Sequence, residues 1–302
     1  MKTIKMHSNG FLLIDKPRKI SSHYALKNIK RLCHGKIGHS GTLDPFATGM
    51  LAVSIGQASK FMAYQIQADK TYQAILQLGR KTDTQDLTGE IIEEKSVPQL
   101  ITQNIQEIIE SQFIGEIQQT PPKYSALKFK GKAYYHYARQ GVEIPLPTRQ
   151  VQIRHYTNID YVADQSQIHF TVTCGSGTYI RALGEDIAQK LGTCGHLISL
   201  RRTSISPWEG QPMYSPESFD ENNLLDRVQP IDKVLKHLPK IQLPSKTIEK
   251  LMQGQWTPCN IMNKDEHSLM RLYDNHSQTF YGIVNIEPPF IKPKKLIHDL
   301  PS

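Results

Sequence analysis

The stretch GHSGTLDPFATGMLAVSIG, residues 38–56, indicates how the first half of the chain folds. Its second part, MLAVSIG, is apolar and of strand length, which predicts a buried β-strand. Its first part is a glycine-rich loop that carries a single carboxylate, Asp44, directly before Pro45. Aspartate before proline is common in turns, so a role as a turn residue has to be weighed against a catalytic role.

The segments on either side of this loop predict a fold that is rich in strands. TYQAILQLG, residues 71–79, alternates in polarity and places Tyr72, Ala74, Leu76 and Leu78 on one face. Strands are predicted, in chain order, at 10–15, 50–56, 71–79, 151–156, 167–174 and 196–206. Helices are predicted from Ser21 or Ser22 to Cys33 and at 59–67, 100–112 and 178–192. Residues 119–132 lack periodicity, which predicts a long loop.

Length and composition indicate a globular protein with room for one large and one small domain. The chain has 302 residues, of which 38% are hydrophobic and 21% are charged. Short strand-like pieces separated by prolines begin near residue 236 and predict a small β-rich terminal domain.

No run of the sequence approaches the roughly 20 apolar residues of a membrane span. The first ten residues lack the apolar centre of a signal peptide, so we expect a cytoplasmic protein. The four cysteines are isolated and show neither a disulfide nor a zinc pattern.

The net charge of +8 is concentrated in one part of the chain. Residues 1–40 contain nine lysines and arginines against one acid, Asp15, and this difference equals the whole excess. A second basic run, KYSALKFKGKAYYHYARQG at 123–141, places Lys128, Lys130 and Lys132 among aromatic residues. Cations beside aromatic rings suit a phosphate backbone with exposed bases. Each run alone is typical of a solvated surface, but the two together favour a nucleic acid as partner.

No motif determines the function by residue type alone. GSGT, residues 175–178, precedes a predicted helix, and helix N-termini attract anions. The glycine patterns of nucleotide-binding loops are nevertheless missing from the sequence. Tyr179 and Arg181 follow in the first turn of this helix, where an arginine faces either a cleft or an exposed salt bridge. His39 has an ordinary interpretation as a hydrogen-bonded loop residue.

Taken together and in order, six blocks of the sequence closely resemble the bacterial tRNA pseudouridine-55 synthases of the TruB family. The blocks are GFLLIDKP, GHSGTLDPFATGML, KTYQAILQLGRKTDTQDLTGEI, PPKYSALKFKGKAYYHYARQG, GSGTYIRALGEDIAQKLG and LISLRRTSIS. The G-x-L-D-P-x-A-x-G pattern within the second block, residues 41–49, is highly specific. Ser40, just before it, and Phe46, at one of its variable positions, stand where threonine and leucine are frequent in the family, and these departures are mild. The resemblance runs from residue 9 to 235. Beyond residue 236 only short fragments resemble the family's PUA-like RNA-binding domain, which leaves a complete or an incomplete terminal domain open.

The resemblance implies an α+β protein with the pseudouridine synthase fold. Its central sheet would be mixed, mainly antiparallel, and flanked by helices and loops, with a small β-rich C-terminal domain. Residues 1–235 would form the catalytic domain, including an RNA-clamping insertion at about 118–147. Residues 236–302 would form the C-terminal RNA-binding-like domain.

The implied reaction requires one carboxylate and neither a cofactor nor a metal. Converting uridine to pseudouridine breaks the bond from ribose C1′ to base N1, turns the base, rejoins it through C5 and removes the C5 proton. A carboxylate can serve as the nucleophile in a covalent route, as it does in glycosidases. The resemblance assigns this role to Asp44. Attack on ribose C1′, attack on base C6 and abstraction of a sugar proton all remain open.

Further roles follow from the same resemblance. Tyr72 resembles the tyrosine that stacks on the flipped uracil and assists deprotonation at C5. Arg181 resembles the partner that keeps Asp44 ionised, since an opposite charge lowers the pKa of a carboxyl group. The implied substrate-binding residues are His39 near the extruded nucleotide, Tyr179 and Leu200 around the base, Lys16 with Pro17 beneath the catalytic loop, and Lys128, Lys130 and Lys132 in the insertion.

The implied partner is the T arm of tRNA, from which the target base must be flipped out. A membrane or a protein partner is not implied, and we expect a monomer. Two other function classes remain. A non-catalytic module that binds or folds tRNA would share the charge distribution without needing Asp44, Tyr72 and Arg181 together. A nucleoside hydrolase would need a second acid near Asp44, and the candidates, Asp83 and Asp86, are interpreted as side chains that fix a loop.

Overall fold

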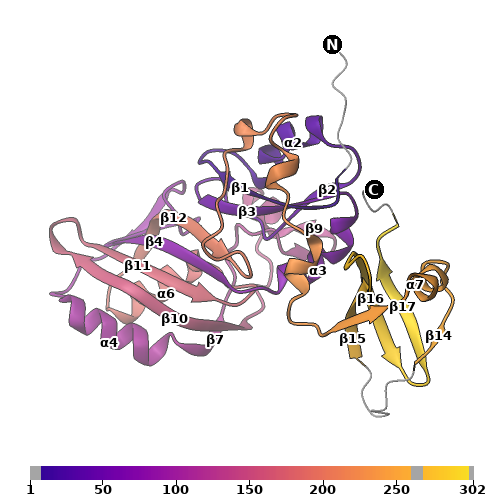
Figure 1. Cartoon of the computed structure of the whole chain (residues 1–302). Helices are drawn as coiled ribbons and strands as arrows, with labels where there is room; N and C mark the ends of the chain where they lie inside the picture. Colours follow the sequence, from indigo (N-terminus) through magenta and orange to yellow (C-terminus); the bar gives the residue numbers. More distant parts are fainter. Residues whose placement is uncertain (1–7, 260–267, 299–302) are drawn as a thin grey trace.

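A computed structural model describes residues 8–259 and 268–298 of the chain (Figure 1). Lys2 and Lys5 of the basic N-terminal run lie outside these residues. Figure 1 shows β4, β10, β11 and β12 with α4 and α6 at one end, β1, β2 and β3 in the middle, and a separate sheet at the other end. The mixed central sheet and the β-rich terminal sheet confirm the predicted fold class.

The central sheet has eight strands in the order β1-β3-β12-β4-β11-β10-β7, with β2 paired to β3. Its strands are β1 (Gly10–Lys16), β2 (Ile37–Ser40), β3 (Thr48–Ile55), β4 (Lys70–Leu78), β7 (Gly115–Gln119), β10 (Arg149–Val162), β11 (Gln167–Cys174) and β12 (Gly195–Ile205). Neighbours are antiparallel, but β12 runs parallel to β3. Along β4 the inward face is the predicted one, with Tyr72, Ala74, Leu76 and Leu78 in the core.

The helices do not all lie on the central sheet: α6 packs on β12 and β4, and α4 packs on β10, whereas α7 packs on the C-terminal sheet. They are α1 (Ser22–Ala25), α2 (Lys27–Leu32), α3 (Met62–Ile66), α4 (Thr102–Gln112), α5 (Tyr134–Arg139), α6 (Ile180–Lys190) and α7 (Ser245–Met252). Short 3₁₀ helices are η1 (Gly56–Phe61), η2 (Ala163–Gln165), η3 (Pro216–Ser218), η4 (Leu225–Arg227) and η5 (Ile231–Leu235).

The first predicted helix is wrong in one respect, because the chain forms two short helices instead of one. Ser21 caps α1, since its side chain accepts a hydrogen bond from the Tyr24 amide. At Leu26 the backbone takes φ −84° and ψ −4°, and its amide bonds to the His23 carbonyl three residues back. This tighter bond separates α1 from α2, although the predicted apolar face is buried in both.

The contact between β3 and β12 depends on Gly49, the last residue of the G-x-L-D-P-x-A-x-G pattern. Its φ is +104°, and a Cβ atom there would lie 2.1 Å from the carbonyl oxygen of Arg202. Only glycine accommodates both the left-handed backbone and the close approach of another chain segment. The pattern therefore places the Asp44 loop directly against β12.

The prediction of a long loop at 119–132 is wrong in part. Residue 119 ends β7, and residues 128–133 form a hairpin of β8 (Lys128–Phe129) and β9 (Lys132–Ala133) that leads into α5. The two turn residues, Lys130 and Gly131, have φ of +47° and +83°, as in a type I′ turn. Lysine is unusual at the first of these positions, so the hairpin left no signal in the sequence. Another hairpin, β5 (Arg80–Thr82) with β6 (Ile91–Glu94), flanks the polar turn at 83–90.

The C-terminal sheet has five strands in the order β13-β15-β16-β17-β14 and carries α7. Its strands are β13 (Lys240–Leu243), β14 (Thr257–Pro258), β15 (Ser268–Asp274), β16 (Phe280–Glu287) and β17 (Phe290–Leu296). The ring of Phe280 lies 6.2 Å from that of Phe61, and the Tyr273 hydroxyl donates to Asp232 at 2.6 Å. Apolar and polar contacts thus join this sheet to the rest of the chain.

Candidate active site

The loop that carries Asp44 is fixed by buried neighbours on both sides. Leu43, Phe46 and Ala47 all pack into the central core. The Ser22 hydroxyl accepts a hydrogen bond from the Leu43 amide at 2.9 Å and donates to the Leu43 carbonyl at 3.0 Å. The Ala47 amide donates to the Asp44 carbonyl at 3.1 Å, which closes the turn that the sequence predicts. The turn therefore holds the backbone, while the Asp44 side chain faces a pocket.

Lys16 lies inside the protein next to this loop. Its side chain is fully buried, and its ammonium donates to the carbonyl oxygens of Pro17 at 2.8 Å and Ile20 at 2.9 Å. Burial lowers the pKa of Lys16 to about 8, whereas the nearby Asp44 carboxylate favours its charged form. Lys16 is fully enclosed at the place beneath the catalytic loop that the resemblance implies, and its role toward substrate stays a prediction. Its position is that of a support beneath the loop.

Arg181, the second residue of α6, connects three parts of the chain through one buried guanidinium. Its Nε lies 2.9 Å from Asp44 Oδ2, an ion-pair distance at which the N–H is not aligned for a hydrogen bond. Its Nη1 donates to the carbonyl of Thr84 at 2.7 Å and lies 3.7 Å from Asp86 Oδ2. Its Nη2 donates to the carbonyl of Tyr124 at 2.8 Å. Two backbone carbonyls thus orient the guanidinium toward the carboxylate.

The surroundings of Asp44 act on its charge in opposite directions. Partial burial raises the pKa of Asp44, whose side chain is 36% exposed, and the Asp86 carboxylate adds to this effect. The Arg181 guanidinium and the Lys16 ammonium oppose it by favouring the ionised form. The net direction is upward, so the ionised state of Asp44 depends on how well these cations are placed.

Asp86 is a second carboxylate in the region, although it lies far from Asp44 along the chain. It is 4% exposed, and its Oδ1 accepts hydrogen bonds from the Thr84 hydroxyl and from the amide and hydroxyl of Thr88. Asp83 Oδ1 accepts from the Glu90 amide in the same turn. Both acids therefore fix this turn, as the sequence predicts, and neither lines the pocket over Asp44. The arrangement does not favour a hydrolase with paired carboxylates.

A pocket of about 440 Å³ opens over Asp44 and Arg181, within the size range of small-ligand sites. Tyr72 of β4, Leu200 of β12 and Tyr179 before α6 line its walls. The Arg149 guanidinium lies over the Tyr179 ring, 4.7 Å from its centre. Residues 125–127 and 175–178 also line the pocket. Five of the predicted site residues, Asp44, Tyr72, Tyr179, Arg181 and Leu200, thus meet in one pocket.

Two buried cations at the pocket wall were not predicted. Arg202, 1% exposed, donates from Nε to the Met50 carbonyl at 2.7 Å and from Nη2 to the Gly41 carbonyl at 2.8 Å. Its Nη1 donates to the Tyr72 hydroxyl at 3.4 Å. Burial, together with the nearby charge of Arg202, lowers the pKa of Lys70 to about 8. Arg202 therefore connects both ends of the Asp44 loop to the tyrosine.

Other predicted residues lie outside the pocket. His39 is half-buried on β2 and is not among the lining residues, and burial and the charge of Arg202 lower its pKa. Lys128, Lys130 and Lys132 are exposed on the β8–β9 hairpin, directly after the lining residues 125–127. A role for these lysines would therefore be contact with a large ligand that extends beyond the pocket.

Within residues 8–259 and 268–298, acidic, histidine and cysteine side chains do not come together in threes that would hold a metal ion. In the same part of the chain, no helix combines the length and apolarity needed to cross a membrane. All four cysteines are free thiols.

Comparison with known proteins adds the family relationship. Residues 27–180 match the model of the TruB family pseudouridylate synthase N-terminal domain, and residues 239–297 match that of the pseudouridine synthase II TruB C-terminal domain. The chain is 39% identical over 297 residues to tRNA pseudouridine synthase B of a Marinomonas species, covering 96% of this chain and 95% of the relative. It is 40% identical over 293 residues to the protein of the same name from Caldanaerobacter subterraneus subsp. tengcongensis, covering 96% and 100%.

Among solved structures, the archaeal box H/ACA sRNP Nop10-Cbf5 complex matches with a TM-score of 0.67 at 22% identity, covering 95% of this chain and 85% of that chain. This likeness shows a shared fold. The match of residues 239–297 to the C-terminal domain model extends the relationship beyond residue 235, where the sequence alone showed only fragments.

Proposed function

The chain belongs to the TruB family of tRNA pseudouridine synthases, and we propose that it converts the uridine at position 55, in the T loop of tRNA, to pseudouridine. Membership of the family confirms the prediction of a tRNA pseudouridine synthase, while position 55 and the T arm belong to the proposal. The observation that supports it most is the pairing of Asp44 with Arg181 at 2.9 Å in a pocket lined by Tyr72.

In this proposal Asp44 is the catalytic carboxylate. The reaction breaks the C1′–N1 bond of uridine and forms a C1′–C5 bond. C5 loses one proton and N1 takes one up, so the product is an isomer of the substrate, and atoms and electrons balance without an external reactant. An ionised carboxylate is required for nucleophilic attack or for proton abstraction, and Arg181 favours that state. The rigid turn around Asp44 keeps its carboxylate in one position while the base is turned.

Tyr72 is proposed to hold the uracil ring and to assist removal of the C5 proton. Its side chain is 7% exposed at the pocket wall, where an aromatic ring can stack on a base. Burial raises the pKa of Tyr72, and Arg202 next to its hydroxyl opposes this shift. The buried arginine thus makes the phenolic proton easier to release than burial alone would allow.

The target base must leave a folded RNA loop to reach this pocket, which requires base flipping. The insertion supplies exposed lysines beside the pocket, and we infer that they bind the phosphates of the T arm. We also propose a catalytic domain at 1–235 and an RNA-binding domain at 236–302. A monomer that acts in the cytoplasm stays a prediction from the sequence.

Release of tritium from tRNA labelled at uridine C5 tests the function, because isomerisation frees this proton and binding does not. A tRNA with cytidine at position 55 is the matched control substrate. We expect tritium release from the tRNA with uridine at position 55. The tRNA with cytidine at this position should release no tritium from its T loop. Equal release from both would move the target to another uridine. Tight binding without release would favour a non-catalytic tRNA-binding module.

A further inference from the structure

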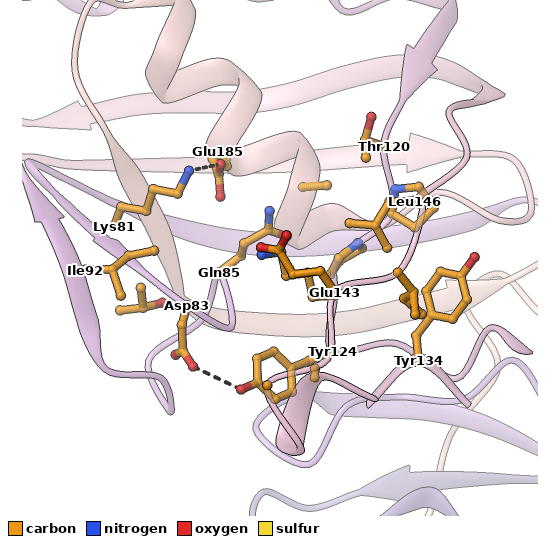
Figure 2. A pocket seen from close by; sticks show the side chains of 18 of the residues that line it. Lys81, Asp83, Gln85, Ile92, Thr120, Tyr124, Tyr134, Glu143, Leu146 and Glu185 are labelled. Carbon is orange, nitrogen blue, oxygen red and sulfur yellow. Dashed lines mark hydrogen bonds and ion pairs between the residues drawn. The ribbon is translucent and has the colours of Figure 1, made fainter. Parts of the chain in front are cut away.

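A second cavity, of about 690 Å³, lies between the insertion and the rest of the catalytic part (Figure 2). Pro121, Tyr124 and Leu146 line it from the insertion, and Lys81, Gln85 and Glu185 line it from the opposite side. The insertion thus spans a hollow at this point. Individual hydrogen bonds therefore have a large share in fixing the position of the segment around Tyr124.

Tyr124 makes two such bonds, one with its backbone and one with its side chain. Its carbonyl accepts from Arg181 Nη2 at 2.8 Å, and its hydroxyl donates to Asp83 Oδ2 at 3.2 Å. Figure 2 shows the second bond, with Tyr124 and Asp83 facing each other at the edge of the cavity. Asp83 is itself tied to the 83–90 turn through the Glu90 amide. The same turn supplies the Thr84 carbonyl, the other acceptor of Arg181.

We propose that Tyr124 is a positioning residue for the synthase reaction: its hydroxyl, held by Asp83, fixes the carbonyl that orients Arg181 toward Asp44. The inference rests on the proposed function, since it takes Asp44 to be the catalytic group. Arginine presents its donors in a rigid planar fork, so acceptors on Nη1 and Nη2 determine where Nε points. A shift of the Tyr124 carbonyl would leave a buried N–H unpaired, and the guanidinium would turn to find another acceptor.

Tyr124 also connects the reaction to RNA binding. It is the second residue of the basic run 123–141, and residues 125–127 that follow it line the pocket over Asp44. RNA held by the exposed lysines of the hairpin therefore acts on the segment that orients Arg181. The insertion then has two roles: its lysines contact the RNA, and its Tyr124 carbonyl orients Arg181.

The proposal predicts a pH effect of defined sign. The charged groups that face Asp44 are Arg181, Lys16 and Asp86. Turning Arg181 away removes the strongest influence that favours the ionised carboxylate, so the pKa of Asp44 rises. As the pH falls, activity that needs the ionised carboxylate is then lost at a higher pH than in the parent protein.

The test compares Tyr124→Phe with Tyr273→Phe, which also removes a tyrosine hydroxyl bonded to an aspartate, at the remote Tyr273–Asp232 pair. Single-turnover tritium release at saturating tRNA and the tRNA Kd are measured across pH. For Tyr124→Phe we expect a rate that is lower by about threefold to tenfold, which corresponds to the loss of one hydrogen bond. The Kd should stay within about twofold of the parent value. The acid limb of the pH profile, where the rate falls as the pH decreases, should move to higher pH. Tyr273 lies in the proposed RNA-binding domain, so for Tyr273→Phe we expect the parent rate at saturating tRNA and the parent pH dependence, with any effect confined to Kd.

Asp83→Asn and the double variant complete the test. If both side chains act through one bond, the double variant loses no more rate than Tyr124→Phe alone. An unchanged rate and acid limb in Tyr124→Phe, a rise in Kd alone, or an equal loss in Tyr273→Phe would each overturn the inference. An inactive parent would instead remove the proposed function, so the two failures are distinguishable.

Discussion

The loop that carries Asp44 and the insertion that carries the exposed lysines are held in place by different means. Leu43 and Ala47 are 3% and 0% exposed on either side of Asp44, and Ser22 binds both backbone groups of Leu43. The insertion instead spans a cavity of about 690 Å³. A reacting carboxylate requires a fixed position to within a fraction of an ångström, whereas a surface for RNA benefits from adjustment. Burial fixes the first region, and hydrogen bonds connect the second to it.

Two glycine substitutions test this difference in stability, and we expect their effect to be the largest. Gly49→Ala places a Cβ atom 2.1 Å from the Arg202 carbonyl oxygen at φ +104°, so the free energy of unfolding should fall by about 3 kcal/mol or more. Gly131→Ala, in the hairpin of the insertion, has φ +83° but no atom within 4 Å of the new Cβ. It should cost only about 1–2 kcal/mol. Urea unfolding measures both, and equal losses would contradict the contrast between the two regions.

The pH dependence of the single-turnover rate examines the fixed region. In the proposed mechanism Asp44 must be ionised. Burial raises its pKa, so the rate should fall as the pH drops through a value above the ordinary carboxyl pKa of about 4. Asp86→Asn removes the like charge that adds to this shift, while the asparagine oxygen can still accept the bonds of the turn. The acid limb of this variant should therefore move to lower pH. A limb that stays in place or moves to higher pH would contradict the assigned role of Asp86.

The smallest expected effect on the rate concerns the insertion. Replacing Lys128, Lys130 and Lys132 by alanine removes three exposed cations from the hairpin. The tRNA association constant falls with salt concentration, and each phosphate contact adds roughly 0.7 to 0.9 to the steepness of this log–log plot. The plot for the variant should therefore be less steep by about 2. The rate at saturating tRNA should change by less than about threefold, because Asp44 and Arg181 stay in place. An unchanged slope would show that these lysines do not meet the RNA backbone.

Much of the fold could be predicted because its signals are local. The alternation in residues 71–79 determines which face of β4 is buried, and it places Tyr72 in the core without knowledge of its neighbours. The G-x-L-D-P-x-A-x-G pattern likewise reports a loop whose last glycine, Gly49, has no alternative. The resemblance placed Tyr72, Tyr179, Arg181 and Leu200 in one site with Asp44, and these residues share one pocket.

The remaining features depend on contacts between distant segments. Asp86 reaches Arg181 only because the 83–90 turn folds against α6, and Tyr124 bonds to Asp83 at the edge of a cavity. Arg202 did leave a signal, since it follows Leu200 by two residues and shares its face of β12. A charged residue on the inward face of a strand predicts a buried cation that is hydrogen-bonded, because an unpaired buried charge is costly. The break at Leu26 and the Lys130–Gly131 turn had no comparable signal.

The most direct test of the account is the rate of Asp44→Asn, measured as tritium release from tRNA labelled at uridine C5, together with its tRNA Kd. Asparagine keeps the shape of the side chain but removes the charge that pairs with Arg181 and that the reaction requires. The account predicts a Kd within about threefold of the parent and a rate lower by at least about a thousandfold. A rate within about tenfold of the parent would show that Asp44 only forms the turn, and would contradict its role as the catalytic carboxylate.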